Sequence, residues 1–94
     1  EEAGVCAFVI EAVPAALACE ITTAACIPTI GIGAGVNCDG QVLVLHDLLG
    51  LSERSFTFAK AYSNLRHISI NAISEYVSDV QSRRFPDASN SFTY

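Results

Sequence analysis

One carboxylate, Glu11, follows directly on the apolar run formed by residues 5–10. An uninterrupted apolar run of this length is typical of a parallel strand that is buried on both faces. A carboxylate at the carboxyl end of such a strand would be partly desolvated, which favours its use as a general base. The alternative is a structural carboxylate that caps a helix or pairs with a lysine, and the residues alone leave both interpretations open.

Two other groups follow apolar runs. Residues 31–35 have the pattern G-x-G-x-G, whereas a dinucleotide-binding fingerprint needs G-x-G-x-x-G between a strand and a helix. These glycines either admit an anionic ligand close to the backbone or form a tight turn at the rim of the sheet. His46 and Asp47 end the third apolar run. An imidazole there is capable of acid–base chemistry, but a structural hydrogen bond to the next loop is the favoured interpretation.

The cysteines do not suggest a metal site. Cys6, Cys19, Cys26 and Cys38 are irregularly spaced and include no C-x-x-C pair, which argues against zinc ligation. We therefore expect free thiols in a reducing, cytoplasmic compartment.

The order of apolar runs and helical patterns predicts an α/β fold. Strands are expected near 5–10, 28–32 and 41–46, a helix from Ala15 to Ala25, C-terminal helices over about 56–84, and a tail over 85–94. The long helix from Leu65 has the clearest periodicity, and Asp79 and Arg83 are expected to pair at i,i+4. Strands that alternate with helices indicate a parallel sheet.

The composition suggests that this sheet is part of something larger. Hydrophobic residues make up 51% of the chain and charged residues only 16%, against about 25% charged in typical soluble domains. We expect faces that other chain covers. A complete (β/α)8 TIM barrel needs about 250 residues, so residues 1–94 are predicted to be one partial barrel domain, holding the last three βα units and a long C-terminal helix. The chain has no methionine, and the amino-terminal part is expected to be absent.

Charge and hydropathy exclude two classes of partner. The net charge is −5 and only five residues are basic, so no basic patch is available for nucleic acid. Residues 21–38 carry no charge, but a proline and three glycines interrupt them. A membrane span is therefore not expected.

Several longer stretches resemble ketopantoate hydroxymethyltransferases, and together they cover nearly the whole chain. They are Phe8–Pro14, Ile27–Gly35, Cys38–Asp47, Phe58–Tyr62, Glu75–Val77, Phe85–Pro86 and Ser91–Phe92. The runs IPTIGIGAG and DGQVLVLHD are the most specific of these. The cysteines and the segment 51–58, which lacks the family's proline-lysine step, depart from the family pattern.

The resemblance implies a function. Enzymes of this family transfer a hydroxymethyl group from 5,10-methylenetetrahydrofolate to the 2-oxo acid 2-oxoisovalerate, with Mg²⁺ assisting enolisation. Glu11 matches the family's proposed proton acceptor, and Ile32, Val42 and Val44 match positions that line the pocket for the substrate's branched tail. The two valines are expected on one strand and therefore on one face.

The resemblance also implies what this chain lacks. The family's metal-binding acids belong to earlier strands, so no metal ligand is expected here and the chain alone is expected to be inactive. The family's C-terminal helices build a ring-shaped homo-oligomer, a decamer. Two alternatives stay open, namely a truncated, non-catalytic remnant that only associates with a partner, and a different oxo-acid-binding barrel.

Overall fold

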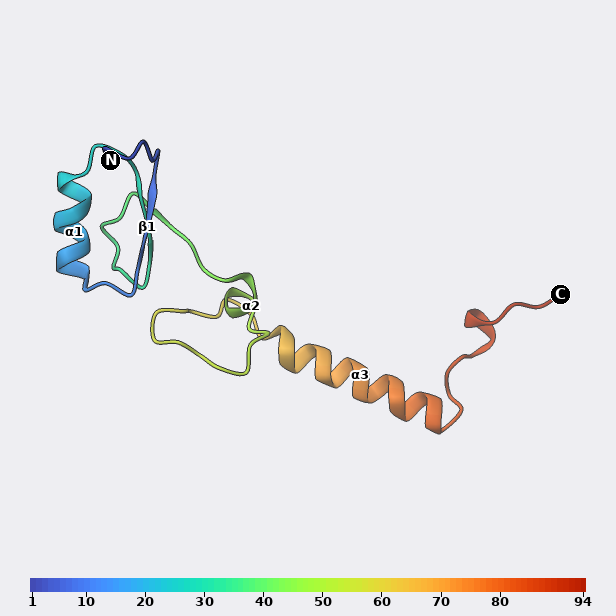
Figure 1. Ribbon diagram of the computed structural model, residues 1–94. Coiled ribbons are helices and arrows are strands. Elements are labelled where there is room, and N and C mark those ends of the chain that lie inside the picture. Colours follow the sequence, from blue (N-terminus) through green and yellow to red (C-terminus); the bar gives the residue numbers. More distant parts are fainter.

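The computed structural model describes residues 1–94, and it places a small α/β unit at the amino end of a long, projecting helix (Figure 1). The elements in chain order are β1 (Phe8–Glu11), α1 (Ala15–Ala24), β2 (Thr29–Ile32), β3 (Gly40–Gln41), α2 (Leu45–Leu48), α3 (Leu65–Gln81) and the 3₁₀ turn η1 (Ala88–Asn90). None of the helices has the length and apolar character needed to cross a membrane.

The three strands form one parallel sheet in the order β1-β2-β3. Glu11 is opposite Ile32 in the first pair of strands, and Gly31 is opposite Gln41 in the second. The amide of Val42 donates to the carbonyl of Gly31 at 3.0 Å, so backbone pairing continues one residue beyond β3. The predicted α/β class with a parallel sheet is confirmed.

Helix α1 covers only one face of this sheet. Ile10 and Ala18 pack together with Ala34 and Cys38, with the side chain of Phe8 against them. Val9, whose side chain alternates to the other face, is 58% exposed. The expectation that the first strand is buried on both faces is therefore wrong for this chain, because no element lies over the second face.

The predicted third strand is also corrected. Only Gly40–Gln41 of the expected strand near 41–46 is paired, and the chain becomes helical at Leu45. The third strand is short because its partner strand β2 ends at Ile32. Beyond Ile32, β2 offers no backbone groups with which later residues of the third apolar run could pair. A strand's length depends on its neighbour, and an apolar run cannot reveal where that neighbour stops.

A polar cluster centred on Thr29 joins α1, β2 and the loop before β3. Thr29 is completely buried, and its hydroxyl lies 2.8 Å from that of Thr22. The carboxylate of Asp39 accepts the backbone N–H of Thr29 at 2.8 Å, while the N–H of Asp39 donates to the Thr29 hydroxyl at 3.2 Å. These bonds fix the amino end of β2 relative to its helix.

We expect Thr29→Val to lower the free energy of unfolding by about 0.5–1.5 kcal/mol, because it removes the hydroxyl that hydrogen-bonds to Thr22 and to the N–H of Asp39. Urea denaturation monitored by circular dichroism measures the change. Thr23→Val is the matched control, since Thr23 is exposed on the same helix and its replacement should change stability much less. Equal effects of the two substitutions would contradict a role for the cluster centred on Thr29.

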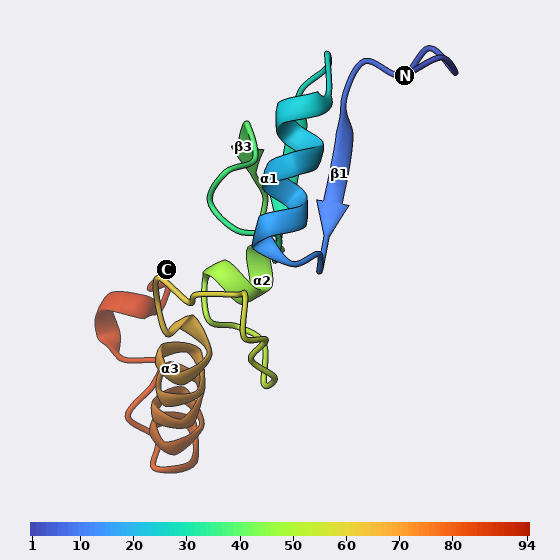
Figure 2. The same ribbon diagram turned by 90° about the vertical axis from the view of Figure 1, so that its left-hand side faces the viewer.

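Helix α3 projects away from the sheet in both ribbon views (Figures 1 and 2). The molecule measures 69 × 30 × 17 Å with a radius of gyration of 22.5 Å, against roughly 13 Å for a compact chain of about 100 residues. No residue of α3 is buried. The long helix begins at Leu65, as its periodicity predicts. The helical prediction over 56–64 is wrong, because residues 49–64 form a loop in which Tyr62 and Leu65 donate backbone hydrogen bonds back to the carbonyls of Leu48 and Leu49.

The carboxyl end of α3 is closed by backbone hydrogen bonds. The N–H of Arg84 donates to the carbonyl of Asp79 at 2.8 Å, and the N–H of Arg83 donates to Val80 at 3.2 Å, which is the Schellman pattern. Arg83 has a left-handed backbone with φ of 56°. The chain turns at this residue, so Arg84 forms the ion pair with Asp79 at 2.9 Å. The predicted Asp79–Arg83 pair is wrong.

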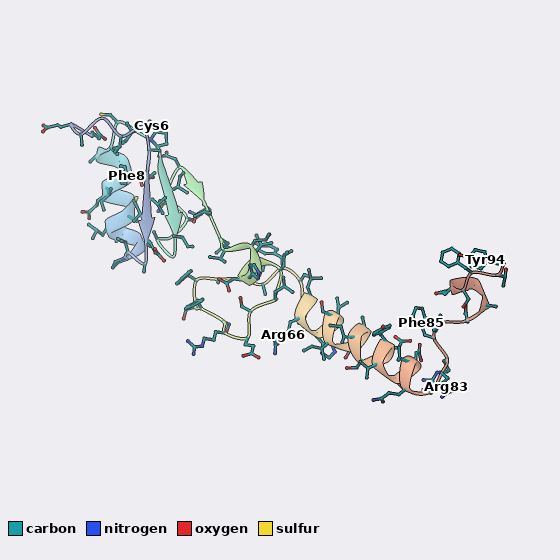
Figure 3. All side chains as sticks on the ribbon, turned by 45° about the vertical axis from the view of Figure 1, so that its right-hand side comes forward. Cys6, Phe8, Arg66, Arg83, Phe85 and Tyr94 are labelled. Carbon is teal, nitrogen blue, oxygen red and sulfur yellow. The ribbon has the colours of Figure 1, made fainter.

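Beyond α3, the first residues of the tail pack back against the helix. The ring of Phe85 meets the ring of Tyr76 edge-on, with centroids 5.7 Å apart. Figure 3 shows Phe85 and Tyr94 at the far end of the molecule from Cys6 and Phe8.

The turn η1 should respond to acid. The hydroxyl of Ser89, and then its backbone N–H, donate to Asp87 and hold the pKa of this carboxyl below its ordinary value. Its stabilisation of the turn is therefore present above the unfolded pKa of about 3.9 and is lost as the pH falls through the lowered folded value. An NMR titration of the Asp87 carboxyl carbon should give a midpoint below that of an unstructured peptide. An equal or higher midpoint would contradict these hydrogen bonds.

Candidate functional site at the carboxyl edge of the sheet

Three of the predicted site residues form a row across the carboxyl edge of the sheet. Glu11 ends β1 and is paired with Ile32, the last residue of β2. Val42 directly follows β3, and the register of that pair of strands, continued by one residue, puts it opposite Ile32. Neighbouring strands lie roughly 4.8 Å apart. One residue from each strand is thus brought to the same edge.

The row lies on the face that α1 does not cover. Paired residues of parallel strands point to the same face and successive residues alternate. Ile10 and Thr29 contact α1, so Glu11 and Ile32 point to the opposite side. Glu11 is exposed there. The expected desolvation of its carboxylate is therefore absent in this chain, because nothing in the chain lies above the row.

Val44 is separate from this row. It is the residue before α2, with an extended backbone, and is 54% exposed. The prediction that Val42 and Val44 lie on one strand is wrong, because β3 ends at Gln41. Val44 lies along the chain just beyond the edge of the sheet.

The glycine loop that follows β2 packs closely against two other segments. Gly33 and Gly35 have φ angles of 64° and 81°. A Cβ atom on Gly33 would lie 2.9 Å from Cγ of Phe58, and one on Gly35 would lie 2.5 Å from Cβ of Ala15. Glycine is therefore required at both positions for two reasons, the left-handed backbone and the lack of space.

An open hollow of about 400 Å³ lies beside this loop. It is lined by Gly33, Ala34, Gly35, Val36, Gln41 and Phe58. The loop leads from β2 into β3 with no helix between them, so it lacks the strand–helix context of a dinucleotide fingerprint. Sequence reasoning missed Phe58 as a lining residue. It lies in a segment predicted to be helical, and only its contact with Gly33, 25 positions earlier, places it here.

The other candidate groups do not form a site. His46 lies in α2, where its carbonyl accepts the N–H of Leu51 at 2.8 Å. The four cysteines are free thiols. No group of three or more His, Cys, Asp or Glu side chains comes together to hold a metal ion. The residues of this chain therefore do not fit a complete Mg²⁺ site.

Comparison with known proteins decides the family. The family model described as ketopantoate hydroxymethyltransferase matches residues 1–88. The chain belongs to this family. The resemblance inferred from the sequence is confirmed, and the family is one of hydroxymethyltransferases.

Curated relatives with the name 3-methyl-2-oxobutanoate hydroxymethyltransferase agree with the family match. The protein of Caldivirga maquilingensis is 57% identical over 86 residues, which are 92% of this chain and 32% of the relative. That of a Cyanothece species is 56% identical over 86 residues, or 92% of this chain and 33% of the relative. That of Syntrophotalea carbinolica is 52% identical over 94 residues, or 99% of this chain and 35% of the relative. The chain spans about a third of the length of these relatives.

Proposed function

We propose that this chain supplies the carboxyl-edge strands of an enzyme that transfers a hydroxymethyl group from 5,10-methylenetetrahydrofolate to 2-oxoisovalerate, giving ketopantoate. The observation that carries this proposal is the row formed by Glu11, Ile32 and Val42. It combines one carboxylate with two branched apolar side chains at the edge where parallel α/β sheets bind their ligands.

In the proposed reaction, Glu11 acts as the base. Its carboxylate removes the proton from the carbon next to the oxo group of 2-oxoisovalerate, which leaves an enolate. The enolate carbon forms a bond to the one-carbon unit, and both bonds between that unit and its two folate nitrogens break. Water supplies the oxygen of the new hydroxyl group, while one nitrogen takes up a proton from this water and the other takes up the proton that Glu11 removed. Ile32 and Val42 contact the branched tail of the oxo acid, and Val44 closes the pocket beyond them.

The open face and edges of the sheet support the proposal that the working domain is a (β/α)8 barrel. Only six of 94 residues are buried, too few for a self-sufficient core, and the uncovered face carries the row. In a closed barrel, the remaining strands would cover this face and desolvate Glu11. The Mg²⁺ implied by the family would aid enolisation by taking up negative charge on the oxo group, with its ligands in that remaining part.

The exposed helix α3 supports a homo-oligomer, for which the family's ring-shaped decamer is the model. Apolar residues occupy a broad sector of its surface: Ile68, Ile70, Ile73, Tyr76, Val77 and Val80 are each more than 40% exposed. Such a surface is typical of helices that another element covers. The four free thiols support a reducing, cytoplasmic location.

A chimera tests the proposal. Residues 1–88 of this chain, which the family model matches, would replace the corresponding third of the Caldivirga relative, to which the chain is 57% identical over 86 residues. We expect ketopantoate formation from 2-oxoisovalerate and 5,10-methylenetetrahydrofolate at a rate within about tenfold of the unmodified relative, a loss of about 1.4 kcal/mol at most. A folded chimera that forms no ketopantoate would instead favour the alternative of a non-catalytic remnant.

A further inference from the structure

We propose that Ala12 is a positioning residue for Glu11. Its left-handed backbone turns the chain sharply at the end of β1, so that the Glu11 carboxylate stays at the edge of the sheet. Ala12 directly follows Glu11 and has a φ angle of 53°. Alanine rarely adopts such an angle, and backbone strain of this kind is concentrated at functional sites. This inference rests on the proposed function, because it explains how the base of that reaction is held.

The connection between β1 and α1 needs such a turn. Only residues 12–14 separate the two elements, and Figure 2 shows α1 beginning close to the end of β1 and running back alongside it. An extended residue at position 12 would carry the chain straight on past the edge, with only Val13 and Pro14 left to reverse it. The turn at Ala12 sends α1 to one face of the sheet while the Glu11 side chain points to the other.

Two contacts hold the turn in place. The N–H of Ala12 donates to the carbonyl of Ile32 at 2.9 Å. At the start of α1, Ala15 packs closely on Gly35, where a Cβ atom would lie 2.5 Å from Cβ of Ala15. The left-handed residue is thus fixed between the end of β2 and the loop that follows it, and Glu11 is fixed with it.

The choice of alanine fits a positioning role. This chain uses glycine at the positive φ angles of Gly33 and Gly35, where glycine adopts the conformation without strain. A glycine at position 12 would also reach many other conformations, whereas alanine reaches few. Alanine therefore defines the direction of the turn, and of the carboxylate before it, more narrowly.

Deuterium incorporation into 2-oxoisovalerate by the chimera, in heavy water without folate, tests this role. We expect Ala12→Val to lower the exchange rate about 10- to 100-fold, because a β-branched residue is a poor occupant of the left-handed region and the base would be displaced. Ala12→Asn should keep the rate within about threefold, since asparagine is similar in size to valine but tolerates this conformation. The Kd for 2-oxoisovalerate, measured by calorimetry, should change less than about threefold in both variants.

Arg83→Val is the matched control for strain alone. Arg83 is the other non-glycine residue with a positive φ, at 56°, and Figure 3 shows it at the far end of α3 from the sheet. The substitution should lower the thermal midpoint as Ala12→Val does, yet leave exchange within about twofold of the parent. An equal loss of exchange in Arg83→Val would overturn the positioning role, because it would reflect stability only.

The same measurements separate this inference from the proposed function. Glu11-dependent exchange in the parent, with equal rates in Ala12→Val and Ala12→Asn, would overturn the role of Ala12 alone. Absence of exchange in the parent would overturn the proposed function and this inference with it. If Ala12→Val does not fold, Ala12→Leu takes its place, and exchange equal to that of Ala12→Asn would again overturn the role of Ala12.

Discussion

Replacing Glu11 by glutamine in the chimera is expected to lower kcat by about 10²–10⁴-fold, the usual contribution of a positioned general base. Glutamine has nearly the same shape but cannot accept the proton from the carbon next to the oxo group. Because the substitution removes an interaction needed only in the reaction step, the Kd for 2-oxoisovalerate should change little. Steady-state kinetics give kcat, and isothermal titration calorimetry gives the Kd.

Glu20→Gln is the control for this prediction. Glu20 is exposed on α1, on the helix that covers the opposite face of the sheet from Glu11, and its loss should leave kcat within about twofold of the parent, or about 0.4 kcal/mol. Near-normal turnover by Glu11→Gln would exclude this carboxylate as the base. A large rise in the Kd for the oxo acid would give it a binding role instead.

Replacing Val42 by aspartate is expected to weaken 2-oxoisovalerate binding about 10- to 100-fold. A carboxylate placed beside Ile32 in a covered pocket would lack a partner, and burying such a polar group typically costs about 1–3 kcal/mol in protein substitutions. It would also repel the carboxylates of Glu11 and of the substrate. The Kd of the chimera for 2-oxoisovalerate, measured by calorimetry, checks this expectation.

Two further aspartate variants test the geometry of the row. Val44→Asp should weaken binding less than Val42→Asp, because Val44 lies beyond the end of β3. Val5→Asp should leave binding unchanged, since Val5 precedes β1 at the opposite, amino end of the sheet. An unchanged affinity in Val42→Asp would show that this side chain faces away from the substrate.

The local sequence pattern was sufficient to predict the strand that carries the proposed base. The apolar run before Glu11 predicted a strand with this carboxylate at its end, and the structure has β1 over Phe8–Glu11. The helix over Ala15–Ala24 also lies within one residue of its predicted end. In both cases the pattern of neighbouring residues determines the element, so the sequence is informative.

Features that depend on distant contacts were not predictable from pattern. The apolar run over 41–46 has a strong strand propensity, but β2 offers no partner past Ile32, so Val44 lies outside the sheet. Phe58 lines the hollow because Gly33 leaves space for its ring. Neither relationship appears in any local window of sequence, since each requires knowledge of which segments meet in space.

The open surface of the chain was foreseeable from composition alone. A low charged content predicted faces that other chain covers, and the structure leaves Val9 and the apolar sector of α3 exposed. Composition cannot tell which element does the covering, because burial by another part of the domain and burial by another subunit require the same residue types.

The proposed role of Glu11 is tested most directly by deuterium incorporation next to the oxo group of 2-oxoisovalerate, catalysed by the chimera in heavy water without folate. This measurement isolates the proton transfer assigned to Glu11 from folate binding and from bond formation. We expect exchange within about tenfold of the unmodified relative, and at least about a hundredfold less in the Glu11→Gln variant. A folded chimera that binds the oxo acid and exchanges its proton equally well with and without Glu11 would contradict it.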